Sequence, residues 1–175
     1  MLSTLKTLTV DGVEMASLSF NGVPVWEAPP SYKNRVPVSI DTDGSIYNGC
    51  GYKELLRLSS GGTVKEKANS VVTGYIPAKG GDIVRIAGVN WAYSSSANYI
   101  CAYNSDFVHI GAGTSQGSIY STKIWESVNA DGEMGIVKLA PLDSIAYIRV
   151  SSAGDNTKQE KGDKMIVTIN EKIVA

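Results

Sequence analysis

The chain has 175 residues, with 16 Lys and Arg against 17 Asp and Glu and a formal net charge of -1 at pH 7. A chain of this length can bury enough surface to fold without disulfides or metals, and its balanced charge excludes the basic footprint of a nucleic-acid or anionic-membrane partner. Short apolar runs and a start without a basic, apolar leader predict no membrane helix and no secretory signal, so we expect folding in a cytoplasm. The two cysteines, Cys50 and Cys101, are expected to be buried or half-buried free thiols, and a single disulfide between them is the alternative.

The first 28 residues contain a repeated hairpin pattern. Residues 8–15 (LTVDGVEM) are echoed by residues 18–25 (LSFNGVPV), and each copy places Asp-Gly or Asn-Gly between apolar residues. These dipeptides tolerate the positive φ angles of a type I′ turn, so the pattern predicts a three-stranded β-meander over residues 1–28. Such a small unit buries too little to be stable alone, so we expect it to pack on the rest of the chain or to dock on a partner. The candidate docking residues are Phe20, Val23, Val25 and Trp26.

Residues 28–31 (APPS) predict a stiff, extended connector, because proline fixes its own φ and restricts the residue before it. From there on, short apolar or alternating runs are separated by turn residues, which is typical of a sandwich of short strands. The predicted strands cover residues 36–40, 71–76, 83–86, 99–103, 108–110, 118–120, 136–139, 145–150 and 165–169. Residues 53–58 and 122–128 could each hold a helical turn, and the glycine-rich residues 111–117 are expected to form a flexible loop. The sequence therefore predicts an all-β protein, a jelly-roll-like β-sandwich over residues 32–175 preceded by the small meander.

Catalytic chemistry has little support in the sequence. His109 is the only histidine, it lies in an alternating stretch where a structural or surface role is expected, and no nucleophile motif accompanies it. Most acidic residues lie in turns, where Asp commonly bonds its own backbone. Residues 41–44 (DTDG) resemble part of a calcium loop but lack its later acidic ligand, so a plain β-turn is expected. We therefore expect no enzyme activity, no metal and no cofactor.

The residues around Trp91, the second of the three tryptophans, suggest a binding site of another kind. Trp91 and Tyr93 could stack on a sugar ring while Asn90 and Asn98 bond its hydroxyl groups. The alternative is that the aromatic residues of this region fill the core, which we expect for most of them, including the neighbours in residues 99–103. Trp91 and Tyr93, beside three serines, are the best candidates for exposure.

A set of turn and strand motifs extends from residue 39 almost to the end of the chain. The motifs are residues 39–49 (SIDTDGSIYNG), 51–52 (GY), 57–60 (RLSS), 73–77 (TGYIP), 81–82 (GD), 84–86 (VRI) and 147–149 (YIR). Together with the Asn-Gly hairpin that ends at Val25 and Trp26, this set resembles a cassette in minor structural and tail-associated proteins of phages that infect Gram-positive bacteria.

The resemblance implies a virion β-sandwich, assembled in the host cytoplasm, that acts in assembly or attachment. Its implied partners are other virion proteins. The open strands of the N-terminal meander separately predict pairing with further copies of the same chain. The alternative is a carbohydrate-binding domain that recognises polysaccharide on the host cell surface, which the same fold could also support. The chain lacks heptads and collagen-like triplets, so a compact module is expected rather than a fibre.

Overall fold

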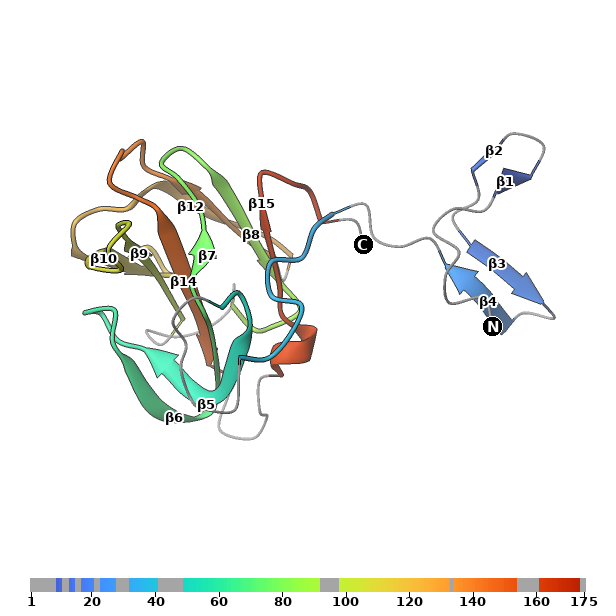
Figure 1. Cartoon of the computed structure of the whole chain (residues 1–175), viewed down its shortest axis with the longest axis horizontal. Helices are drawn as coiled ribbons and strands as arrows, with labels where there is room; N and C mark the ends of the chain where they lie inside the picture. Colours follow the sequence, from blue (N-terminus) through green and yellow to red (C-terminus); the bar gives the residue numbers. More distant parts are fainter. Residues whose placement is uncertain are drawn as a thin grey trace.

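The computed structural model describes residues 9–10, 13–14, 17–20, 23–27, 32–40, 49–91, 98–132, 134–153 and 161–173. Within these ranges the chain forms β-strands and a single 3-10 turn, and two antiparallel sheets face each other as a sandwich (Figure 1). The predicted all-β sandwich is thereby confirmed. No helix in these ranges is long and apolar enough to cross a membrane.

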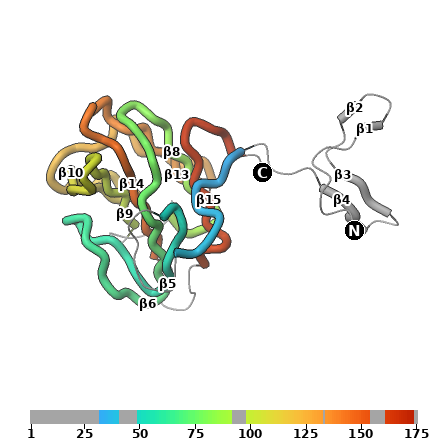
Figure 2. The backbone as a smooth tube through the Cα atoms, in the orientation of Figure 1, coloured from blue at the N-terminus to red at the C-terminus, as the bar shows by residue number. Residues whose placement is uncertain are grey.

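The larger sheet has the strand order β11-β10-β9-β14-β6-β5, and the short β7 pairs with β14. Its strands are β5 (Tyr52–Leu58), β6 (Val64–Thr73), β7 (Ile76–Pro77), β9 (Tyr99–Tyr103), β10 (His109–Thr114), β11 (Ile119–Ser121) and β14 (Tyr147–Ala153). The smaller sheet has the order β12-β13-β8-β15. Its strands are β8 (Ile83–Ala87), β12 (Trp125–Asp131), β13 (Met134–Leu139) and β15 (Ile166–Ile169). The chain crosses between the sheets repeatedly, as Figure 2 shows along the tube, so neighbouring strands are mostly distant in sequence.

The main hydrophobic core lies between the two sheets. It contains the apolar residues that alternate inward along the strands, such as Ile100 and Ala102 of β9, together with Trp91 and Trp125. The remaining residues of β9, Tyr99, Cys101 and Tyr103, belong to a second buried cluster. Because successive side chains of a strand point to opposite faces, this second cluster lies on the outer face of the larger sheet. Every residue of β9 is consequently buried.

The outer cluster is buried because the hairpin of β5 and β6 folds over that face. Both strands bend at residues with positive φ, Leu55 (62°) and Asn69 (60°). The register changes there, from Glu54 opposite Val71 to Leu56 opposite Glu66. An unequal number of residues on the two strands is the mark of a β-bulge, which bends the strands. The half of the hairpin beyond the bend is therefore directed across the sheet.

Several local predictions are corrected by these strands. Residues 53–58 lie in β5 rather than in a helical turn, and residues 125–128 of the second predicted turn lie in β12. The double-leucine pattern of residues 53–58 suggested a helix because the bulge interrupts the alternation expected of a strand. Residues 36–40 form no strand, since Asn34 bonds Val36 N at 3.1 Å and Val167 N at 3.0 Å and holds this segment along β15.

The glycine-rich stretch is also different from the prediction. Residues 111–114 belong to β10, and only the turn that follows resembles the expected loop. A Cβ atom on Gly113 would lie 1.0 Å from a ring atom of Trp125, and one on Gly111 would lie 2.3 Å from Thr122 O. Glycine is thus used here for close approach of a core tryptophan to the sheet, not for flexibility.

The N-terminal segment forms two separate two-stranded sheets. β1 (Thr9–Val10) pairs with β2 (Val13–Glu14), and β3 (Ser17–Phe20) pairs with β4 (Val23–Glu27). The two hairpins were predicted by the Asp-Gly and Asn-Gly signals. Among the residues that the structure describes here, β2 pairs with β1 and β3 pairs with β4, so they form two hairpins rather than the expected three-stranded meander. Of the candidate docking residues, Phe20 ends β3, and Val23, Val25 and Trp26 lie in β4.

Candidate functional site

The structure does not assemble the glycan site predicted around Trp91. Trp91 is fully buried in the main core, where its ring packs on Gly135, so the prediction of its exposure is wrong. Tyr93 and the predicted turn at residues 41–44 lie outside the described residues. The tryptophan is buried because the largest apolar side chain of the chain gains most by leaving water.

Asn98 has a structural role. Its Nδ2 donates to Asn90 O at 2.8 Å and to Trp91 O at 3.0 Å, and its Oδ1 accepts from Ala153 N at 2.7 Å. Asn98 is fully buried, so this amide satisfies backbone groups that would otherwise be buried without partners. Asn90 contributes its backbone to this arrangement.

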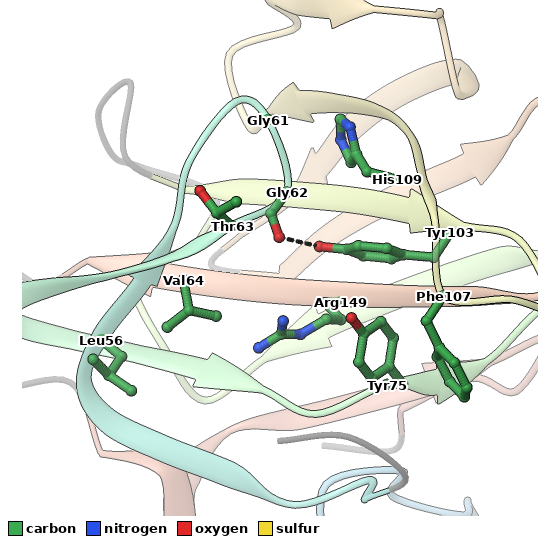
Figure 3. Close-up of a pocket in the computed structure, with 10 residues that line it drawn as sticks. All are labelled: Leu56, Gly61, Gly62, Thr63, Val64, Tyr75, Tyr103, Phe107, His109 and Arg149. Atoms are coloured by element: carbon green, nitrogen blue, oxygen red, sulfur yellow. Dashed lines mark hydrogen bonds between the residues drawn. The ribbon is translucent and has the colours of Figure 1, made fainter. Parts of the chain in front are cut away.

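A pocket of about 450 Å³ lies instead on the outer face of the larger sheet, beneath the bent hairpin (Figure 3). Its position follows from the bend, because a straight hairpin would leave this face of β9 and β14 uncovered. The residues that line it are Leu56, Gly61, Gly62, Thr63, Val64, Tyr75, Tyr103, Phe107, His109 and Arg149. Segments far apart in sequence therefore contribute to one site.

Three aromatic residues that line the pocket, Tyr75, Tyr103 and Phe107, form a cluster with Tyr147, which stacks on Phe107 but does not line the pocket. We call these four residues the aromatic wall. Tyr75 contacts Tyr103 edge to face with centroids 4.9 Å apart, and Phe107 at 4.8 Å. Phe107 stacks on Tyr147 at 4.8 Å with an interplanar angle of 20°. Edge-to-face and offset-stacked pairs of this kind fix one another's orientation. The wall is consequently preformed.

Phe107 reaches the wall from a tight turn between β9 and β10. Its φ is 60°, a conformation that side-chain-bearing residues other than Asn and Asp rarely adopt. Asn104 stabilises the turn, since its Oδ1 accepts from Asp106 N at 3.0 Å and Val108 N at 2.9 Å. The side chain of Asn104 thus replaces the backbone partners that a tight turn leaves unused.

The tip of the hairpin, residues 59–63, is attached to the sheet by polar contacts. Tyr103 OH donates to Gly62 O at 2.7 Å, and Cys101 Sγ lies 3.7 Å from Ser59 O as a weak donor. Gly62 has a φ of 74°, and a Cβ there would lie 2.4 Å from the imidazole of His109. Only glycine allows this tip to lie so close to the strands.

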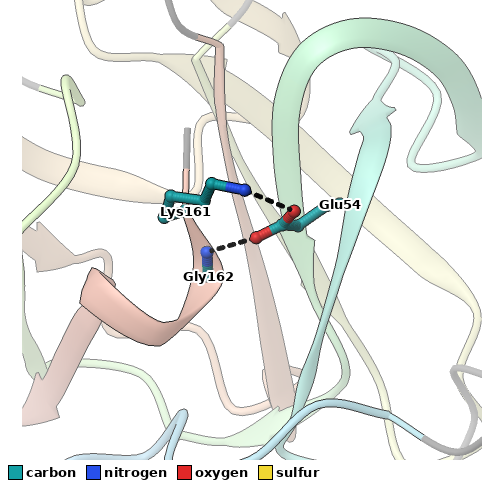
Figure 4. A network of polar contacts seen from close by, with 3 residues as sticks. All are labelled: Glu54, Lys161 and Gly162. Atoms are coloured by element: carbon teal, nitrogen blue, oxygen red, sulfur yellow. Dashed lines mark hydrogen bonds and ion pairs between the residues drawn. The ribbon is translucent and has the colours of Figure 1, made fainter. Parts of the chain in front are cut away.

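At the start of the same hairpin, before the bend, β5 is attached to the segment that contains Lys161 and Gly162 (Figure 4). Glu54 accepts from Gly162 N at 3.2 Å and lies 3.5 Å from Lys161 Nζ. Gly162 begins the 3-10 turn η1 (Gly162–Lys164). The charge pair is partly exposed and contributes little by itself, but the backbone bond holds β5 against this turn. The hairpin is therefore fixed at both ends of its bend.

Arg149 is the charged residue of the pocket. It extends from β14, is only 2% exposed, and donates from Nε to Thr73 O at 3.0 Å. Its guanidinium carbon lies 5.0 Å from the centre of the Tyr75 ring, a cation–π contact. Its Nη2 is buried and finds no hydrogen-bond partner among the described residues, and neither of their two ion pairs involves Arg149. A buried guanidinium is thus left with an unused donor.

Burial also shifts the acid–base groups of this face. Desolvation raises the pKa of the Cys101 thiol to about 12 and raises the pKa of the Tyr103 phenol as well. Desolvation lowers the pKa of His109, and a backbone hydrogen bond at Gly111 opposes that shift. At neutral pH the thiol and phenol are protonated and the imidazole is uncharged, so Arg149 carries the charge of the pocket.

The rings of His109 and Tyr103 are held by contacts within the protein. The uncharged His109 packs against the Tyr103 ring at a centroid distance of 5.7 Å, and the Tyr103 hydroxyl is already bonded to Gly62. No nucleophile held by a general base is formed by these lining residues. Among the described residues no three His, Cys, Asp or Glu side chains lie close enough to hold a metal ion.

The key residues of this pocket were not predicted as site residues. Tyr103 was expected to fill the core of the sandwich; it is buried, but in the cluster on the outer face of the larger sheet. The roles of Tyr75, Phe107 and Arg149 depend on the bend of a distant hairpin. The only signal was that Tyr75 and Arg149 belong to two of the motifs, TGYIP and YIR, that carry the phage resemblance. Both cysteines are free, as expected.

Comparisons of the chain with protein-family models, with curated proteins and with solved structures found no match.

Proposed function

We propose that this chain is a non-enzymatic attachment module of a phage virion, whose β-sandwich binds carbohydrate of the host cell surface. The pocket beside the aromatic wall supports the binding part of this proposal more than any other feature. Its volume of about 450 Å³ is within the range of pockets that hold small ligands. It combines aromatic surface with hydroxyl groups and a guanidinium, the groups that pack on sugar rings and bond their hydroxyls.

The virion part of the proposal rests on the resemblance of the motifs to phage structural proteins. It is compatible with the N-terminal hairpins, because two-stranded sheets leave strand edges to which another chain could add. We propose that β3 and β4 dock this chain to other virion proteins or to copies of itself. The alternative to a carbohydrate-binding role is accordingly a purely structural role in virion assembly, with the pocket unused.

Carbohydrate binding is tested by measuring retention of the full chain on a glycan array and on isolated cell-wall polysaccharides. We expect retention that is lost in Phe107→Ala, which removes one ring of the aromatic wall. Val108→Ala is the matched control, because Val108 is the next residue in the chain, is exposed and does not line the pocket. Absence of retention on every polysaccharide, or equal retention of both variants, would contradict the proposal.

The docking role is tested separately by light scattering after size-exclusion chromatography and by co-purification with virions. Self-association or virion attachment is expected to be lost when Phe20 and Trp26 are both replaced by Ser. If the full chain is a monomer and attaches to no virion protein, the assembly role fails while carbohydrate binding is unaffected.

A further inference from the structure

Arg149 has a guanidinium hydrogen-bond donor in the pocket that lacks a partner among the described residues. Its guanidinium lies between Val64 and Tyr75 in Figure 3, and its Nη2 is buried without a partner in the described part of the chain. Burying a charge without pairing is costly, and buried arginines are normally bonded to a carboxylate, a phosphate or several carbonyls. In the described part of the chain, the Arg149 side chain makes a single hydrogen bond, from Nε to Thr73 O.

Two features argue against a purely structural guanidinium. The first is that the described ion pairs, Lys138 with Glu126 and Lys161 with Glu54, are both partly exposed, whereas the buried Arg149 has none. The second is that the other groups of the pocket cannot supply an anion. Burial raises the pKa of the thiol and phenol beside Arg149, so neither becomes its counter-ion at neutral pH.

We propose that the pocket recognises an acidic saccharide, and that Arg149 binds a singly charged oxyanion carried by that saccharide. This inference rests on the proposed carbohydrate binding and names its ligand class. One guanidinium neutralises one charge, so a uronic acid carboxylate or a phosphodiester between polyol units fits better than a doubly charged phosphate monoester. Tyr75 holds the guanidinium from one side, and the aromatic wall provides apolar surface for the ring that bears the anion.

The pocket offers contacts to both the anion and the sugar ring of such a ligand. Nη2 supplies the charge-assisted hydrogen bond, which is about twice as strong as a bond between neutral groups. Phe107 and His109 are the half-buried rings of the pocket and would contact the sugar itself. Because the site is largely shielded from water, salt screens this charge pair less than a pair at the surface.

The experiment is a titration of the full chain, followed by NMR, with four probes. Methyl glucuronide and glycerophosphoglycerol carry the two candidate anions, methyl glucoside is the neutral counterpart, and acetate is an anion without a sugar. We expect at least one charged probe to bind about tenfold more tightly than methyl glucoside, as a charge-assisted bond would give. The preferred probe distinguishes the carboxylate from the phosphodiester.

Two variants test whether Arg149 causes the preference for the charged probe. Arg149→Met is expected to remove the preference for the charged probe. Arg35→Met is the matched control, since Arg35 also has a buried Nε without a partner among the described residues but does not line the pocket. Should Arg149→Met fail to fold, the Arg149 side-chain NH signals of the unmodified chain decide. A larger shift at saturation with the preferred charged probe than with methyl glucoside supports pairing, and equal shifts with both probes contradict it.

The outcomes separate the two proposals. Equal affinity for methyl glucoside and both charged probes would overturn the acidic-ligand inference and leave carbohydrate binding standing. Binding of acetate that depends on Arg149, without binding of any saccharide, would overturn the proposed function. Binding of no probe at all would overturn both.

Discussion

Tyr103 and Gly62 are 41 positions apart in the sequence and are joined by a hydrogen bond of 2.7 Å from the phenol to the backbone carbonyl. This bond connects the centre of the larger sheet to the tip of the hairpin that covers it. Because the phenol is almost completely buried, the bond is shielded from competition by water. The shape of the pocket therefore depends on a contact made outside the main core.

Replacing Tyr103 by Phe should loosen the hairpin tip without unfolding the sandwich. The change removes one buried hydrogen bond and leaves Gly62 O without its partner, so we expect a loss of about 1–2 kcal/mol in the free energy of unfolding. Amide hydrogen exchange in residues 59–63 should quicken as the tip detaches. Tyr147→Phe, which keeps the stacked ring, serves as the control and should change neither quantity. Unaltered exchange in Tyr103→Phe would show that the tip is held by other contacts.

Gly113→Ala should destabilise the protein strongly. The added methyl group would overlap the Trp125 ring in the main core, and overpacking of this kind costs about 1–3 kcal/mol or more. Urea unfolding measures the effect. Gly61→Ala offers the comparison, since the nearest atom to its Cβ is Ser59 Oγ at 3.9 Å and a shift of a few tenths of a kcal/mol at most is expected. Equal stability of the two variants would contradict the packing of Trp125 on β10.

The two thiols should differ in reactivity. Cys101 is fully buried and its pKa is raised to about 12 by desolvation, so almost no thiolate is present at pH 8. A thiol reagent such as DTNB should therefore modify the half-buried Cys50 alone in the folded protein and both cysteines in denaturant. Cys50→Ala should reduce the native count to zero, whereas Cys101→Ala should leave it at one. Rapid native modification in Cys50→Ala would mean that the outer cluster opens readily.

His109 should make the protein less stable as the pH falls. Its folded pKa lies below the ordinary 6.5 because of desolvation, so between about pH 7 and pH 5 the unfolded chain binds a proton that the folded chain does not yet bind. Uptake by the unfolded state favours unfolding, so this contribution to stability is present at neutral pH and is lost as the pH falls. Urea unfolding of the wild type and of His109→Gln over this range isolates the contribution. A steeper loss of stability in the variant than in the wild type would reverse the sign and refute it.

The sequence predicted a strand of the sandwich best where a short apolar run is bounded by turn residues. Residues 99–103 were predicted as a strand and form β9 with the same bounds, because its apolar residues are flanked by turn residues on both sides. β5 was missed because its alternation is broken at Leu55, where the bulge lies. The sequence pattern of one segment can predict the regular part of a strand. It cannot predict a bulge, because a bulge depends on the pairing with a partner strand.

The candidate site was predicted poorly for a related reason. The search for exposed aromatics selected Trp91, whose burial is decided by the small residue Gly135 in a strand 44 positions away. The pocket found instead requires β5, β9, β10 and β14 to meet under a bent hairpin. Which strands lie next to one another depends on the strand order in the sheet, and the periodicity of a single sequence does not predict that order.

The bent hairpin supplies much of the pocket without contributing its outer half to the core between the two sheets. Its outer half, residues 56–66, contributes Leu56, Gly61, Gly62, Thr63 and Val64 to the pocket, while none of these belongs to the core between the sheets. If the proposed carbohydrate binding holds, exchange of that segment is expected to alter which saccharide the chain binds and to leave the residues between the two sheets unchanged. Substitution of about a dozen consecutive residues would then be enough to change the ligand.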